Sequence, residues 1–171
     1  NADIVRGSFR DFGGNTPSGW IADFLIEPQN GIQTLDEFLD NSISFVVWSS
    51  LYRTEFLNLN NLRFTPGILL EDGDFTVRSY LKARKVLTTN YTDYQYRIRP
   101  GSILTSNNAK RMSESEEIII KKFINELSIT TSDKISNILK KAIYSFMRDW
   151  TRILVKNNVR LNRTISCFED G

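Results

Sequence analysis

The chain of 171 residues contains no histidine and a single cysteine, Cys167. The absence of histidine excludes catalytic triads, general bases and metal sites that depend on an imidazole. One cysteine cannot form an intramolecular disulfide framework. No apolar run approaches the roughly 20 residues that a membrane-spanning helix needs, and no signal peptide is recognisable. Any chemistry of this chain must therefore rest on other side chains.

Strong charge of either sign is also missing. The net charge is +2, from 22 basic and 20 acidic side chains, which argues against a dedicated nucleic-acid binder. The apolar fraction of 40% is that of an ordinary folded protein. Residues 1–105 carry 10 basic and 12 acidic side chains, whereas residues 106–171 carry 12 basic and 8 acidic ones. We therefore expect two parts, 1–105 and 106–171, with the polar segment Gly101–Ser115 as their linker.

The first part is predicted to mix strands and helices. Strands are expected at Ala2–Phe9, Ser44–Trp48 and Val86–Thr89, a loop at Asp11–Gly19, a short helix opened by a Thr34/Glu37 capping box, and a helix from Asp72 to about Lys85. A last strand is expected at Asp93–Arg99, where polarity alternates. Tyr94, Tyr96 and Ile98 then share one face, and Asp93, Gln95, Arg97 and Arg99 share the other. Such a strand covers a core with one face and offers two guanidinium groups on the other.

The second part is predicted to be helix, turn, helix. The first helix is expected to open with a Ser113/Glu116 capping box, and the second to start at Thr131–Asp133. Each has an apolar stripe at helical spacing. The stripes are Ile120, Phe123, Ile124 and Leu127 in the first helix, and Ile135, Ile138, Leu139, Ala142, Phe146, Trp150 and Leu154 in the second.

Five short motifs follow one another between Trp48 and Ile103. They are Trp48-Ser-Ser-Leu51-Tyr52-Arg53, Arg63-Phe64, Leu70-Glu71-Asp72-Gly-Asp74-Phe75, Leu81-Lys82-Ala83-Arg84-Lys85 and Tyr94-Gln-Tyr96-Arg97-Ile-Arg99-Pro100-Gly101-Ser102-Ile103. In order and spacing they resemble the acceptor-side half of family-two inverting glycosyltransferases, over roughly residues 1–105. Asn1–Val5 is similar to the strand that follows the metal-binding Asp-x-Asp motif of that family.

The resemblance implies an α/β fold: a partial GT-A-like domain, Rossmann-like, of the nucleotide-diphospho-sugar transferases, followed by a two-helix extension. The donor-binding half of the family lies upstream of these motifs, so we expect it before Asn1. The family's Mg²⁺ or Mn²⁺ would be held mostly there, and we expect no metal ligand in this chain. Asp72-Gly-Asp74 stands in the place of the Glu-Asp motif rather than of the metal site. We expect the chain alone to be inactive or nearly so.

Two adjacent acids are the predicted catalytic residues. An inverting transfer needs a base that takes the proton of the acceptor hydroxyl, and a carboxylate with a raised pKa is suitable. By resemblance Asp72 is this base and Glu71 is its orienting neighbour. The alternative is that Asp72 only caps a helix and that Glu71 is an exposed acid.

The predicted donor-phosphate site consists of Arg97, Arg99 and Ser102, which match the family's strand and lid positions. Arginine suits a departing diphosphate because its planar fork binds phosphate and offsets its charge. The alternative is that these polar residues simply face water on an amphipathic strand.

Trp48 and Trp20 are the predicted acceptor contacts, since an indole face suits the C–H bonds of a sugar ring. For Trp48 the alternative is packing in the core beside Phe45 and Val47. Ser49-Ser50 replaces the family's Asn-Lys pair after this tryptophan, so no role is predicted for those two positions.

The resemblance further implies the partners: a nucleotide-sugar donor and a glycan or lipid-linked acceptor, in surface polysaccharide or glycan assembly, without nucleic acid. We expect a cytoplasmic protein that contacts the inner face of the membrane through its basic helical part, or else a solvated helical face there. The apolar stripes predict packing on the first part or a homodimer through the helices. The competing hypothesis is a non-catalytic binding or protein-interaction module.

Overall fold

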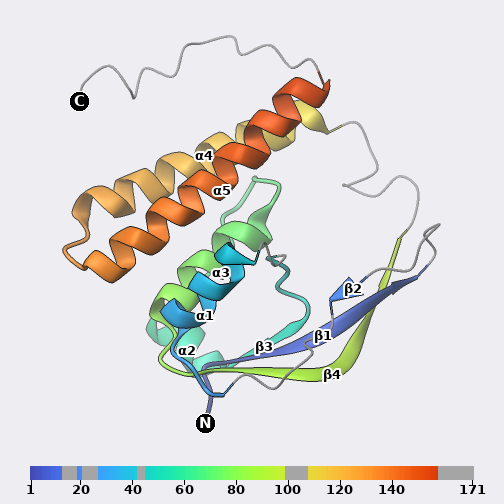
Figure 1. Cartoon of the computed structure of the whole chain (residues 1–171), viewed down its shortest axis with the longest axis vertical. Helices are drawn as coiled ribbons and strands as arrows, with labels where there is room; N and C mark the ends of the chain where they lie inside the picture. The colour runs from blue at the N-terminus through green and yellow to red at the C-terminus, as the bar shows by residue number, and fades with distance from the viewer. Residues whose placement is uncertain (13–18, 21–26, 42–44, 99–107, 158–171) are drawn as a thin grey trace.

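The computed structural model describes residues 1–12, 19–20, 27–41, 45–98 and 108–157. Within them the fold has three layers (Figure 1): a sheet, a middle layer that contains helices α1 (Gly31–Asp40) and α3 (Glu71–Lys82), and an outer pair formed by α4 (Ala109–Ile129) and α5 (Asp133–Asn157). The middle layer thus has the sheet on one side and the helical pair on the other.

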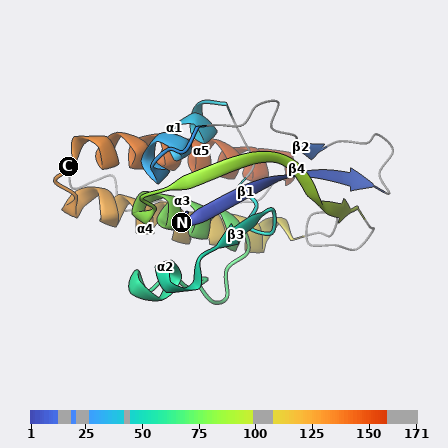
Figure 2. The same cartoon turned by 90° about the horizontal axis from the view of Figure 1, so that it is seen from below.

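The sheet is built around its first strand. β1 (Ile4–Phe12) pairs in parallel with β4 (Val86–Arg97) on one side, and antiparallel with β2 (Gly19–Trp20) and β3 (Ser50–Tyr52) on the other. Figure 2 shows the long strands β1 and β4 side by side. The predicted first strand is thus confirmed, although it continues to Phe12, so the first residues of the predicted loop Asp11–Gly19 belong to the strand.

Three further strand predictions need correction. Ser44–Trp48 is not a strand where the structure describes it, because Val47 and Trp48 form a bend and a turn that leads into β3. Val86–Thr89 and Asp93–Arg99 are not separate strands: β4 runs continuously between them, with register irregularities opposite Ser8. Pairing along β1 supplies the hydrogen bonds that a local pattern cannot reveal.

The helices of the middle layer are real, but their predicted starts are wrong. α1 begins at Gly31, where Asn30 and Gln33 form the capping box instead of Thr34 and Glu37. α3 is capped by Leu70 in a left-handed conformation with φ 64°, so Asp72 lies inside the first turn. α3 also ends at Lys82 rather than near Lys85, since the chain turns there into β4.

The helical pair is confirmed, with one corrected start. α4 begins at Ala109, within the predicted linker, so Ser113 and Glu116 are helix-interior residues and not a capping box. The Ser113 hydroxyl instead accepts a hydrogen bond from Trp150 Nε1 at 2.8 Å. α5 begins at Asp133 as predicted, after Ser132 accepts from the Ile135 amide at 3.4 Å.

One hydrophobic cluster runs through the layers. It contains Ile4 of β1, Phe38 of α1, Tyr80 of α3, Phe123 of α4 and Phe146 of α5. The two predicted parts therefore share one core, while their division at residue 105 stays a prediction. Among the helices that the structure describes, none offers an apolar stretch that could span a bilayer.

Candidate functional site

Asp72 lies in the first turn of α3, at the end of the middle layer. Its side chain is half-buried, and its Oδ2 accepts a hydrogen bond from the Val47 amide at 3.3 Å. Burial raises the pKa of this carboxyl above its ordinary value; the Val47 amide opposes the shift and the adjacent charge of Glu71 adds to it. A carboxylate that is held in place and has a raised pKa can act as a general base.

Glu71 precedes Asp72 and is also half-buried rather than exposed. Both acids lie at the N-terminal end of a helix of 12 residues, where the macrodipole favours negative charge. The alternative in which Asp72 only caps the helix is wrong, because Leu70 is the N-cap. The catalytic roles of the two acids stay predictions.

Asp74, two residues further on, is a structural acid. It is fully buried and forms ion pairs with Arg78 at 2.6 Å and with Lys122 of α4 at 2.9 Å. The Thr65 hydroxyl donates to it at 2.7 Å. Burial alone would raise the pKa of Asp74, but these donors outweigh burial and lower it. Both carboxylate oxygens of Asp74 are thus already bound by side chains of the same protein.

A metal site is not formed by this pair of aspartates. Asp72 and Asp74 have different surroundings, and among the described residues no group of three or more histidine, cysteine, aspartate or glutamate side chains could hold a metal ion. The divalent metal that the resemblance implies, and the position of its ligands, stay predictions.

Trp48 lies against aromatic rings of the sheet. Its ring stacks with Tyr94 at 4.2 Å and Tyr96 at 5.3 Å between centroids, and it meets Phe9 edge-on at 4.8 Å. Tyr94 and Tyr96 thus share a face of β4, as their alternation predicts. The turn that contains Trp48 also contains Val47, so the structure brings the predicted base and the predicted acceptor tryptophan into neighbouring positions.

The other predicted contacts are placed only in part. Arg97 is exposed at the end of β4 opposite Phe12, and strand alternation directs it to the other face from Tyr96. Arg99 and Ser102 lie outside the described residues. Trp20 has a described backbone, paired with Phe9, but its side chain is outside the described part.

Sequence reasoning missed Arg6, whose side chain is completely buried under α1. Its guanidinium lies 4.3 Å from the centre of the Phe38 ring, and Tyr52 and Tyr80 are close enough for charge interactions with it. The pKa of Tyr52 is raised, mainly by burial, and the charge of Asp72 contributes to the rise. A buried, polar set of residues thus extends from β1 toward Asp72. An arginine in a strand pattern gives no signal of burial.

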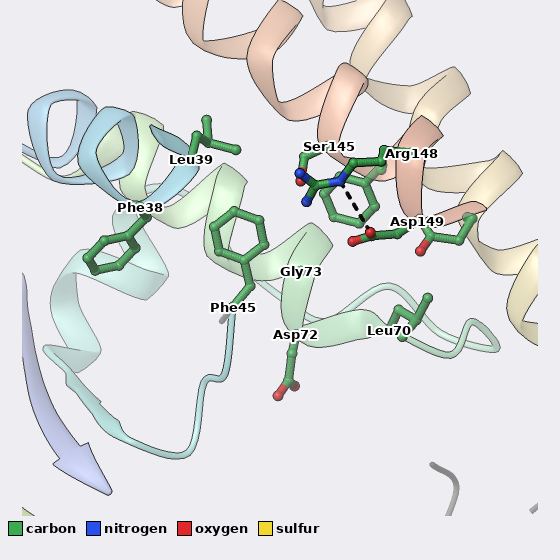
Figure 3. A pocket seen from close by; sticks show the side chains of 11 residues that line it. Phe38, Leu39, Phe45, Leu70, Asp72, Gly73, Ser145, Arg148 and Asp149 are labelled. Atoms are coloured by element: carbon green, nitrogen blue, oxygen red, sulfur yellow. Dashed lines mark ion pairs between the residues drawn. The ribbon is translucent and has the colours of Figure 1, made fainter. Parts of the chain in front are cut away.

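A cavity of about 280 Å³ was missed as well. It lies between the start of α3 and helices α1, α4 and α5. Its lining is Phe38, Leu39, Phe45, Leu70, Asp72, Gly73, Glu116, Ser145, Phe146, Arg148 and Asp149. The Asp72 carboxylate points away from the Arg148–Asp149 ion pair (Figure 3). The sequence places Glu116 in a capping box and predicts no role for Asp149, so only tertiary packing could reveal this cavity.

Comparisons with known proteins give a structural likeness only. No protein-family model matches the chain, and no curated protein matches it by sequence. S. aureus TarS 1-349 in complex with UDP-GlcNAc matches with a TM-score of 0.65 and 15% identity, over 94% of this chain and 45% of that chain. The same TarS segment in complex with UDP matches with a TM-score of 0.60 and 14% identity, over 96% and 43%.

A structure of longer TarS matches with a TM-score of 0.60 and 13% identity, over 96% of this chain and 26% of that one. This chain thus spans less than half the length of each of these structures. TarS is a GT-A glycosyltransferase, and the likeness confirms the α/β, GT-A-like fold that the motifs predict. The chain has the fold of one part of a GT-A glycosyltransferase.

Proposed function

We propose that the protein to which this chain belongs is an inverting glycosyltransferase, and that the chain forms its acceptor-side half. The observation that carries the proposal is Asp72: a half-buried carboxylate with a raised pKa, fixed by the Val47 amide at the start of a helix. The fold shared with TarS, whose structures contain UDP-GlcNAc and UDP, supports a nucleotide-sugar donor.

The proposed reaction is a single displacement. The acceptor oxygen attacks the anomeric carbon while Asp72 takes the hydroxyl proton. The new carbon–oxygen bond forms as the bond to the donor phosphate breaks, and the diphosphate leaves with the electron pair. Attack from the face opposite the leaving group inverts the anomeric carbon. Glu71 helps to keep the pKa of Asp72 high through its charge.

The remaining predicted residues have binding roles in this proposal. Arg97, Arg99 and Ser102 would offset the charge of the diphosphate, and Trp48 and Trp20 would contact the acceptor. The divalent metal implied by the resemblance, Mg²⁺ or Mn²⁺, would add positive charge beside the phosphates. We assign none of its ligands to the described part of this chain, so we place its site in the donor half.

The setting follows from the same resemblance. We propose a cytoplasmic enzyme of glycan assembly that works at the inner face of the membrane on a glycan or lipid-linked acceptor. The helical pair would supply the membrane contact or a homodimer surface. Exposed apolar side chains on it, Ile118 and Ile129 of α4 and Tyr144 and Val155 of α5, are consistent with either contact.

The test is Asp72→Asn in the full-length protein. An amide cannot take up the proton, so we expect kcat to fall by about 10²–10⁴-fold while the far-ultraviolet circular dichroism stays unchanged. The measurement is transfer of labelled sugar from a panel of UDP-sugars to membrane-derived acceptors.

Asp133→Asn is the matched control, since Asp133 is an exposed acid in the first turn of α5, and it should leave kcat unchanged. Full transfer activity in the Asp72→Asn protein would overturn the proposal. A protein without any transfer activity whose biological role survives Asp72→Asn would favour the interaction module instead.

A further inference from the structure

The cavity between α3, α4 and α5 contains polar groups that the proposed reaction does not use. Glu116 of α4 lines it and is only 3% exposed, yet its Oε2 has no hydrogen-bond partner among the described residues. A buried acceptor without a partner is costly. A hydroxyl group that reaches this carboxyl from the cavity, of a water or of a ligand, would satisfy it.

The charge of the lining decides which class of ligand fits. Arg148 and Asp149 form an ion pair with Nε and Oδ1 3.5 Å apart, and Asp149 also pairs with Arg152, which is outside the lining, at 3.2 Å. The lining thus has one charge of each sign at this place. Burial, with a contribution from the charge of Asp149, raises the pKa of Glu116 to about 8, so this carboxyl is mostly neutral at pH 7. Asp72 also lines the cavity, but its carboxylate points away from the ion pair (Figure 3). The rest of the polar wall has no net charge, with Ser145 as a further donor and acceptor, and it favours neither an anion nor a cation.

The apolar wall suits the carbon skeleton of the same ligand. The rings of Phe45 and Phe146 lie almost parallel, with 11° between their planes and 6.3 Å between their centroids. Both line the cavity, as does Leu70. Rings of this kind pack against C–H groups. The volume of about 280 Å³ lies just below the range of about 300–1,000 Å³ for drug-sized ligands, so one small ring fits.

We infer that this cavity binds a neutral polyhydroxylated ring, of the size of one sugar unit. Its hydroxyl groups would bond to Glu116, Ser145 and the Arg148–Asp149 pair, and its C–H groups would lie against the two phenylalanine rings. The Asp72 carboxylate points away from the ion pair (Figure 3), so the ring would occupy the other side of the α3 start. Binding there does not depend on transfer activity, and it can be measured even where the proposed reaction fails.

The experiment is a titration of the ¹⁵N-labelled protein, followed by the amide signals of residues 145–149 and the Trp150 indole signal. The probes are methyl β-D-glucopyranoside and myo-inositol, with inorganic phosphate and choline as charged comparisons. We expect saturable shifts around the cavity with at least one neutral probe, at a dissociation constant on the order of 1–10 mM, and none there with the charged compounds.

Three variants test the assignment of residues. Ser145→Phe fills the cavity from a half-buried position and should weaken binding at least about tenfold. Glu116→Leu removes the polar wall and should do the same, whereas Glu116→Gln keeps a neutral donor and acceptor and should retain binding. Glu117→Gln is the matched control, because Glu117 is the next residue of α4 but pairs with Lys121 at the surface.

The inference is overturned if neither neutral probe gives saturable shifts around the cavity, which would leave water as its only content. It is also overturned if phosphate or choline binds there instead. Equal affinity in the Ser145→Phe protein, provided that its circular dichroism matches the wild type, would place the binding elsewhere and contradict the inference as well.

Discussion

Asp72 and Asp74 are two residues apart on the same turn of α3, but the charged groups around the two carboxylates differ. Burial raises the pKa of the Asp72 carboxyl, the charge of Glu71 adds to the rise, and the single backbone amide of Val47 opposes it only in part. Asp74 is also buried, but it accepts hydrogen bonds from Arg78, Thr65 and Lys122. These donors outweigh burial and lower the pKa of its carboxyl. The same residue type thus supports base chemistry at one position and an ion-pair network at the other.

Removal of the Asp74 carboxylate should destabilise the fold. Asp74→Ala leaves Arg78, Lys122 and the Thr65 hydroxyl without their shared partner. Loss of one member of a buried ion-pair network costs about 3 kcal/mol, and we expect a decrease of that size in the free energy of unfolding, measured with urea.

The comparison for Asp74 is Asp36→Ala on α1. Asp36 also pairs with a lysine, Lys141 of α5, but both side chains are more than 40% exposed. An exposed pair of this kind contributes less than about 1 kcal/mol. Equal losses in the two variants would show that burial of the Asp74 network does not matter, contrary to the expectation.

At the scale of single residues the sequence indicated the two acids and the tryptophan, but not their partners. The motif identifies Asp72, yet the Val47 amide that fixes it comes from a turn 25 positions earlier in the chain. The sequence predicts no role for Asp74, and its ion pair with Lys122 joins α3 to the distant helix α4. Such long-range contacts depend on packing, and local pattern and propensity do not contain them.

The docking of α5 on the start of α3 depends on the absence of a side chain at Gly73. A Cβ atom at this position would lie 2.7 Å from Cζ of Phe146, which is less than van der Waals contact. The ring is itself held by Phe45 and Phe123, so it cannot move away freely. This close approach connects the helical pair to the turn that contains Asp72.

Gly73→Ala should therefore destabilise the protein although alanine is the better helix former. The helix gains up to about 1 kcal/mol from alanine, but overpacking costs typically 1–3 kcal/mol, so a small net loss in the free energy of unfolding is expected. In the proposed glycosyltransferase the displaced turn should also lower kcat.

A double-mutant cycle with Phe146→Leu isolates this contact. The shorter side chain relieves the clash, so Gly73→Ala should cost less in that background than in the wild type. An equal loss of unfolding free energy in both backgrounds would mean that the contact with Phe146 does not cause the effect of Gly73→Ala.

At the scale of elements, the apolar periodicity correctly predicted which helix residues lie in the core. The predicted capping boxes, in contrast, gave wrong helix starts. The apolar stripe of α5 is buried from Ile138 to Trp150 as expected. Both capping boxes read from Thr34 and Ser113 were wrong, because a serine or threonine three residues before a glutamate also occurs inside helices. Stripes extend over several turns and average out such coincidences, whereas a cap rests on two residues.

At the scale of the whole molecule, the helical pair is part of the core and not a separate appendage. The sheet faces the middle helices, and those helices pack against α4 and α5 (Figure 1). A change in a group that is buried between α4, α5 and the middle helices, such as Glu116, should therefore alter the free energy of unfolding of this shared core. The charge difference between the two parts, visible in the sequence, gave no hint of this shared interior.

The stability of the molecule should fall with rising pH because of Glu116. Its pKa is raised from the ordinary value of 4.5 to about 8, by burial and then by the charge of Asp149. Between these values the folded chain keeps a proton that the unfolded chain has released, so the free energy of unfolding decreases as pH rises. The decrease is complete above about pH 8 and amounts to at most roughly 5 kcal/mol.

Glu116→Gln should remove this dependence, since an amide does not ionise in either state. The variant and the wild type should have similar free energies of unfolding near pH 5, and the variant should be the more stable by pH 9, in urea titrations at each pH. All other ionisable groups are common to both proteins, so the difference isolates Glu116. Glu117→Gln should instead follow the wild type. If the Glu116→Gln and wild-type curves ran parallel from pH 5 to 9, Glu116 would ionise in the folded protein as it does in water, and the α4–α5 contact would be wetter than its 3% exposure implies.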